Sequence, residues 1–197
     1  MHGLINRSIQ CFVRNTYGPD TWSRVCARAE LGFENFEAML TYDDAQTEAV
    51  LAAIAALLGR GRRETLEDVG HYLVSNSEIG PVRRLLRFGG ETFIEFLHSL
   101  EDIHERARLA LPGLDCPQFR LRTHSPGCYT LALRWHAPDM GALVLGMLRA
   151  MADDYGALAV FDYAPPAGAR APETITVELL DCGFAAGRTF ELGKAAG

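Results

Sequence analysis

The sequence predicts an α+β fold, in which an N-terminal helical lobe precedes a lobe with a long histidine-bearing helix and a mostly antiparallel sheet. Apolar residues recur every three or four positions through the first half of the chain, which is the period of amphipathic helices. After Pro117 the period changes to two, which is the period of strands. We expect one domain over residues 1–187, divided into lobes 1–65 and 66–187, and a flexible tail over 188–197.

The first part of the chain should contain four helices. In the first of them Leu4 and Ile5 share one apolar side, and Gly18 marks its end. Asp20 is placed to cap the second helix, and Gly59 ends the alanine-rich third. The four expected helices are residues 2–17, 21–31, 43–58 and 64–74.

The rest of the chain changes from helices to strands. Residues 75–90 hold several glycines and a proline, which favour short helices or turns. A long helix is expected over residues 91–111, ended by Pro112 and Gly113. The elements expected after it are a hairpin with strands over 119–124 and 129–136, a helix over 140–155, and strands over 157–163 and 174–181.

The composition excludes several classes of function. The formal net charge of −6 argues against nucleic acid as a partner, because phosphate backbones need a positive surface. The longest apolar run, residues 49–58, is far shorter than the roughly 20 residues that cross a bilayer, so no membrane partner is expected. The five cysteines are widely spaced without a C-x-x-C pair, which is typical of reduced thiols in a cytoplasmic protein.

The motifs of the common enzyme classes are missing from the sequence. The six histidines never form a zinc-protease pattern with a glutamate, and there is neither a G-x-S-x-G turn nor a phosphate-binding loop. No set of catalytic residues is therefore assembled by the sequence, and we do not expect an enzyme.

One histidine lies on the apolar side of the expected long helix. Steps of three and four residues place Leu97, Leu100, His104 and Ala107 on one face, while His98 falls on the opposite, polar face. A histidine in such a stripe is more often a core residue with a hydrogen-bond partner than a ligand. A neutral imidazole that points into an apolar cavity is also what an axial site of haem iron requires.

The chain resembles the haem-nitric oxide/oxygen-binding (H-NOX) sensor domains of bacteria over roughly residues 1–182. The order of the expected elements matches that family throughout. The segments that carry the resemblance are Met1–Asn6, Phe12-Val13, Tyr17-Gly18, Phe93–Leu97, Leu100–Arg106, Leu111–Leu114 and Pro117–Arg120.

The resemblance implies a haem b cofactor held between the two lobes, with His104 as the axial ligand of the iron. It also implies which other residues surround the cofactor. These are Leu4, Ile5, Leu100, Pro112 and Leu145, together with Arg134 and His136.

One motif of the family is missing here. H-NOX domains hold the haem propionates with a Tyr-x-Ser-x-Arg segment late in the second hairpin strand, whereas residues 133–139 read Leu-Arg-Trp-His-Ala-Pro-Asp. Arg134 and His136, or Arg120 and Arg122 of the preceding strand, are the nearest replacement donors. Alternatively, these residues are ordinary polar side chains on a solvated sheet face.

The resemblance implies a haem-dependent sensor of nitric oxide that signals to a separate partner protein, such as a histidine kinase or a cyclic-dinucleotide enzyme. The alternative is a divergent H-NOX-fold protein that has lost haem and acts as an interaction module or binds another small ligand. The missing propionate motif favours that alternative.

The gas ligand is expected to be nitric oxide or carbon monoxide. Oxygen-binding H-NOX relatives hold dioxygen with a distal tyrosine, but residues 140–148 contain no hydroxyl group. Tyr72 is the only nearby hydroxyl that could reach the pocket. We therefore expect no stable oxygen complex, since a pocket without a hydrogen-bond donor gives bound oxygen little help.

Overall fold

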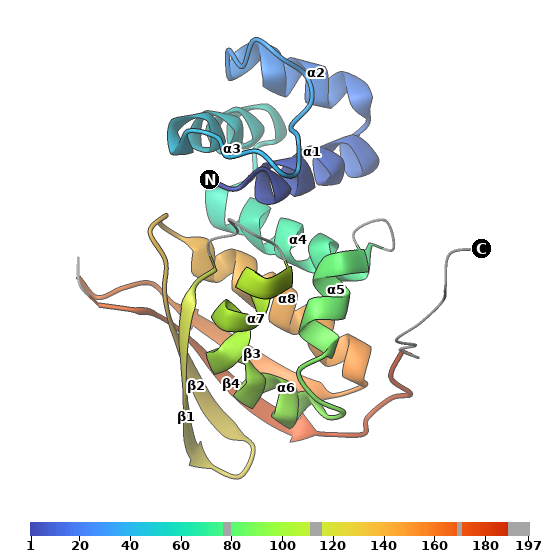
Figure 1. Ribbon diagram of the computed structural model, residues 1–197, viewed down its shortest axis with the longest axis vertical. Helices are drawn as coiled ribbons and strands as arrows, with labels where there is room; N and C mark the ends of the chain where they lie inside the picture. The colour runs from blue at the N-terminus through green and yellow to red at the C-terminus, as the bar shows by residue number, and fades with distance from the viewer. Residues whose placement is uncertain (77–79, 111–115, 169–170, 189–197) are drawn as a thin grey trace.

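The computed structural model describes residues 1–76, 80–110, 116–168 and 171–188, and it confirms the α+β fold. The helices are α1 (Gly3–Tyr17), α2 (Pro19–Arg28), α3 (Asp44–Leu58), α4 (Arg62–Ser75), α5 (Gly80–Arg87), α6 (Phe93–Ser99), α7 (Ile103–Ala110) and α8 (Met140–Tyr155). The strands are β1 (Gln118–Ser125), β2 (Cys128–Arg134), β3 (Leu158–Ala164) and β4 (Glu173–Asp181). In Figure 1, α1, α2 and α3 gather at one end, the sheet lies toward the other, and α4 and α8 lie between them.

Local interactions explain where the first two helices begin. The His2 ring nitrogen Nδ1 accepts a hydrogen bond from the Leu4 amide (3.2 Å) and so caps α1. Gly18 follows α1 with a φ of 89°, a conformation that favours glycine. Pro19 then starts α2 directly, at the position where its missing N–H is harmless, so α2 begins before the expected Thr21.

The single long helix predicted over residues 91–111 is wrong, because this part of the chain forms two shorter α-helices, α6 and α7. A 3₁₀ turn, η2 (Leu100–Asp102), separates them. The Arg106 guanidinium donates to the Ser99 carbonyl oxygen (2.6 Å), and the Ile103 amide bonds to the Leu100 carbonyl instead of to Ser99. Leu100, which begins this turn, and Ile103, which follows it, are both buried.

The sheet has the strand order β1-β2-β4-β3, and all neighbouring strands are antiparallel, as expected. The predicted hairpin is β1 and β2, with Leu121 opposite Leu131, and Leu131 opposite Ile175 of β4. Alternate residues Tyr129, Leu131 and Leu133 are buried, while Arg134 is exposed. One face of the sheet therefore packs on the helices, and the other faces solvent.

One hydrophobic core links the helices to the sheet, and α4 packs closely against α8 at its centre. Because α4 also contacts α1 and α3, the lobe boundary expected at residue 65 falls inside a helix that contacts both regions. The division into lobes 1–65 and 66–187 with a tail over 188–197 stays a prediction. Within the described ranges, no helix combines the length and apolar character needed to cross a bilayer.

Candidate functional site

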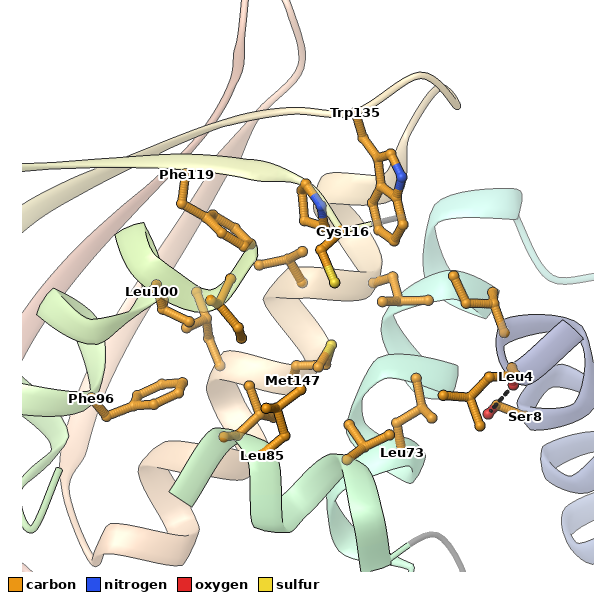
Figure 2. Close-up of a pocket in the computed structure, with 18 residues that line it drawn as sticks. Leu4, Ser8, Leu73, Leu85, Phe96, Leu100, Cys116, Phe119, Trp135 and Met147 are labelled. Carbon is orange, nitrogen blue, oxygen red and sulfur yellow. Dashed lines mark hydrogen bonds between the residues drawn. The ribbon is translucent and has the colours of Figure 1, made fainter. Parts of the chain in front are cut away.

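An apolar cavity lies where α1, α4, α5 and α8 meet the segment from α6 to the start of β1 (Figure 2). Phe96, Leu100 and Phe119 line one end of it, and Leu4 and Ser8 line the other. The empty space between its walls, counted with its opening, is about 800 Å³. The part of this space that a water-sized sphere can occupy is about 100 Å³, which is smaller than the roughly 300–1,000 Å³ of small-molecule and cofactor sites.

The described lining of this cavity contains no charged side chain. Ser8 contributes a hydroxyl, but its Oγ donates to the Leu4 carbonyl oxygen of its own helix (2.7 Å). The Cys116 thiol also lines the cavity, and Figure 2 shows its sulfur pointing inward. Such walls suit a large apolar surface, because burying it stabilises a complex by about 25 cal/mol per Å².

His104 stands at the border of the cavity. It is half-buried and is not itself part of the lining, although Ile103 before it lines the wall. Its Nδ1 lies 3.4 Å from the carbonyl oxygen of Cys116. Cys116 is itself one of the residues that line the cavity. An Nδ1–H donated to that carbonyl leaves the lone pair on Nε2, the tautomer in which a histidine can ligate a metal.

The structure brings some of the expected site residues to the cavity and leaves others away from it. Leu4, Ile5 and Leu100 line it, and their contact with a cofactor stays a prediction. Leu145 is buried but does not line it, because α8 presents Leu143, Val144, Met147 and Leu148 instead. Pro112 lies outside the described residues.

Arg134 and His136 are both exposed, and neither lines the cavity. Arg134 lies opposite Gln118 on the solvent face of the hairpin. The His136 Nε2 lies 3.5 Å from a carboxylate oxygen of Asp44 at the start of α3. That Arg134 and His136 donate hydrogen bonds to a cofactor stays a prediction.

Sequence reasoning missed Trp135 and Pro117, both of which line the cavity. A signal for Trp135 was present, since it continues the inward alternation of Tyr129, Leu131 and Leu133 along the hairpin strand. Figure 2 shows its indole beside Cys116, on the side of the cavity across from Met147. No pattern in the sequence singles out Pro117 in this way.

The Tyr72 hydroxyl does not enter the cavity. Tyr72 is half-buried and is not part of the lining, and its oxygen accepts a hydrogen bond from the Asn15 side chain (2.6 Å). Its ring packs edge-on against Phe12, with centroids 5.7 Å apart. Leu73, the next residue of α4, lines the wall instead.

The site fits one part of a haem group and not another. The apolar walls match the apolar faces of a porphyrin, and the contact of His104 Nδ1 with the Cys116 carbonyl leaves Nε2 as the ring nitrogen that could ligate a metal. The two carboxylates on the edge of haem b would need cations if they were buried, and the described lining offers none.

Comparison with known proteins identifies the family. A family model described as haem-NO-binding matches residues 2–160. Among curated proteins, the chain is 23% identical over 163 residues to soluble guanylate cyclase 89Db of Drosophila melanogaster, which covers 83% of this chain and 24% of that protein. It is 26% identical over 152 residues to soluble guanylate cyclase gcy-31 of Caenorhabditis elegans, which covers 76% of this chain and 21% of that protein.

The chain therefore spans about a quarter of the length of the curated relatives it matches. The matched family is one of sensor domains, which agrees with the expectation that this domain is not an enzyme.

Solved structures with the same fold include two H-NOX proteins. The unliganded Fe(II) protein from K. algicida aligns with a TM-score of 0.77 at 16% identity, covering 92% of this chain and 97% of that one. The protein from S. oneidensis in its Fe(II)NO state aligns with a TM-score of 0.79 at 12% identity, covering 92% of this chain and 100% of that one. These likenesses show the fold.

Proposed function

This chain belongs to the haem-NO-binding family, and on that premise we propose that it binds haem and senses nitric oxide. The observation that carries the proposal is the place of His104 at the border of the apolar cavity. Its Nδ1 faces the Cys116 carbonyl at 3.4 Å, which leaves Nε2 available to a metal. A bound haem b would supply the iron that takes up the gas.

The chain's own residues would hold the group and keep water from it. His104 would hold the iron, and the contact of its Nδ1 with the Cys116 carbonyl would orient its ring. Leu4 and Ile5 of α1 and Leu143 of α8 would cover the faces of the macrocycle, because all three line the cavity. Ser8 would not donate to a bound ligand while its hydroxyl is bonded to Leu4.

The sensed gas would act through the strength of the bond at His104. His104 would link the bound group to α7, and because α7 contacts α5, a ligand that favoured one arrangement of these two helices would increase its population. The signal would then pass to a partner such as a histidine kinase or a cyclic-dinucleotide enzyme. The location we propose for this sensor is the cytoplasm.

A second function is favoured by the uncharged lining. A cavity without a described cation would accept a small apolar ligand as readily as a dianionic cofactor. In that case the protein would be a divergent member of the family that has lost haem. Displacement of a neutral fluorescent dye such as Nile red by apolar compounds would test this second function.

The absorption spectrum of protein purified from haem-replete cells tests the first function. We expect a Soret band with about one haem per chain, and a shift of that band when the reduced protein meets nitric oxide. Protein that carries no haem and takes up none from solution would rule the proposal out.

A further inference from the structure

The two outer strands of the sheet differ in how they are protected from pairing with another chain. The strand order places β1 and β3 at the edges, so among the described residues only β4 pairs with β3. On β1 the Leu121 amide already donates to the Glu101 carboxylate of η2 (3.1 Å), and Arg122 and His124 are exposed. Charged side chains and amides that are already bonded are common means of preventing an edge strand from accepting a further strand.

The β3 edge carries much less charge. Its seven residues include no lysine, arginine or proline, and Asp162 is the single charged residue among them. Its pairing with β4 is regular from Ala159 onward. Leu158 and Val160 point to the solvent side of the sheet, where Val160 is 53% exposed, and the exposed Leu180 of β4 lies on the same side. The edge therefore continues into an apolar surface, which is typical of an interaction site.

A groove lies on the other side of the same edge, between β3 and the helices α4 and α8. Residues 157–161, His71 of α4, and Arg149 and Asp153 of α8 line it, and a water-sized sphere can occupy about 490 Å³ of it. Arg149 and Asp153 are both exposed, and Arg149 also forms an ion pair with Glu67. The groove thus presents one cation and one anion, four residues apart on a single helix.

These features favour a second copy of this chain as the partner. In a two-fold dimer the same residues lie on both sides of the interface, so the surface must be complementary to itself. Antiparallel pairing of two β3 strands about Val160 places Asp162 opposite the partner's Leu158, and no like charges face each other. In the groove, Arg149 can pair with the partner's Asp153. A strongly acidic or strongly basic partner would be repelled by one of these two α8 side chains.

We propose that β3 forms the interface of a homodimer, in which the β3 strands of two copies pair antiparallel and join the two sheets into one. Main-chain hydrogen bonds between the strands would supply the affinity, as in other cases of strand addition. Contact of Val160 with the partner's Val160 and ion pairs between Arg149 and the partner's Asp153 would fix the register. This proposal does not depend on the proposed function, since none of these residues lines the apolar cavity.

Sedimentation velocity of the whole protein tests the dimer. Pairing of one short strand belongs to the small, transient interfaces of less than about 1,200 Å², so we expect a dissociation constant on the order of 10 µM. The mean mass should rise from that of the 21.6 kDa chain toward twice that value as the concentration increases. A wild-type protein that stays monomeric at roughly thirty times the expected dissociation constant would refute the proposal.

A variant of the edge strand locates the interface. Val160→Lys places two like charges opposite each other and should weaken the dimer by about tenfold or more. Thr123→Lys is the matched control, because it adds the same charge at an exposed position of the other edge strand, β1, and should leave the dimer unchanged. Thermal unfolding of dilute protein checks that both variants are folded. A folded Val160→Lys protein with the wild-type dissociation constant would overturn the proposal.

Exchange of the two groove charges tests the self-complementarity. Arg149→Asp and Asp153→Arg should each weaken the dimer by at least about threefold, because each brings like charges together across the axis. The double variant exchanges the partners of both ion pairs and should recover most of the wild-type affinity. A double variant as weak as the two single effects multiplied would contradict the antiparallel arrangement, since the two side chains would then not meet.

Discussion

Gly70 of α4 and Gly146 of α8 form a reciprocal close contact between two helices. A methyl group on Gly70 would overlap the Leu143 carbonyl oxygen, and one on Gly146 would overlap the Glu67 carbonyl oxygen. The two backbones therefore approach more closely than any other residue would permit. Since Leu143 lines the cavity, this crossing also fixes the position of one cavity wall.

Gly70→Ala and Gly146→Ala should each destabilise the protein. Overpacking a close contact costs about 1–3 kcal/mol, which outweighs the roughly 1 kcal/mol that alanine gains over glycine in a helix. The midpoint of urea unfolding measures the effect. Gly168→Ala is the control, because nothing lies within 4 Å of its added methyl group. Unchanged midpoints for both helix variants would show that α4 and α8 do not cross as described.

His104→Ala should abolish haem retention, and free imidazole should partly restore it by filling the vacated space. His98→Ala is the matched control, since His98 is exposed in α6 and should leave haem content unchanged. The ratio of haem to protein after gel filtration is the measurement. A His104→Ala protein with wild-type haem content and spectrum would remove His104 from the site.

The reduced, haem-loaded protein should bind nitric oxide and carbon monoxide without forming a stable oxygen complex. The Tyr72 hydroxyl is bonded to Asn15 outside the cavity, and the Ser8 hydroxyl is bonded to Leu4. Neither donates into the pocket, so bound oxygen would lack a stabilising hydrogen bond. Visible spectra recorded in air test this expectation. A persistent oxygen spectrum that is lost in Tyr72→Phe or Ser8→Ala would identify the donor and contradict us.

Asp154→Ala should be strongly destabilising, by about 3–5 kcal/mol, because it leaves two arginines of α5 without their carboxylate. The Asp154 side chain is 1% exposed and accepts from Arg83 at 2.7 Å, with Arg87 at 3.5 Å. The neighbouring Asp153 is exposed, so Asp153→Ala is a matched control. Thermal unfolding of the two variants would separate them, and equal melting temperatures would argue against the ion pairs.

The Cys26 thiol should resist alkylation near neutral pH. Burial, and then the nearby charge of Glu34, raise the pKa of Cys26 to about 11, whereas Cys182 is exposed. Iodoacetamide at pH 8 should label Cys182 and leave Cys26 unmodified, as peptide mass spectrometry would show. Because the raised pKa keeps the folded thiol protonated, stability should fall as pH rises through 9 toward 11. Rapid labelling of Cys26 at pH 8 would contradict this description.

The sequence predicted the type and order of most elements because those depend on local periodicity. The helical spacing of Leu4, Ile5, Ile9, Phe12 and Val13 predicted α1 and its apolar side, and Leu4 and Ile5 on that side line the cavity. For α8, which is buried over most of its length, spacing gave no such side, and Leu145 was expected only from the family resemblance. The sequence of such a helix does not show which of its sides faces the cavity. The pattern therefore could not distinguish Leu145, which does not line the cavity, from Leu143, which does.

Tertiary structure alone decided the features that depend on residues far apart in the chain. At the 3₁₀ turn before His104 the Arg106 side chain donates to the Ser99 carbonyl, and the His104 ring contacts the Cys116 carbonyl. Asp153 and Asp154 are adjacent and of the same residue type, yet Asp154 is buried against Arg83 of α5 while Asp153 is exposed. The type and spacing of neighbouring residues determine whether a segment forms a helix or a strand. The partners of a side chain depend instead on how separate elements pack together, and a local sequence pattern does not contain that information.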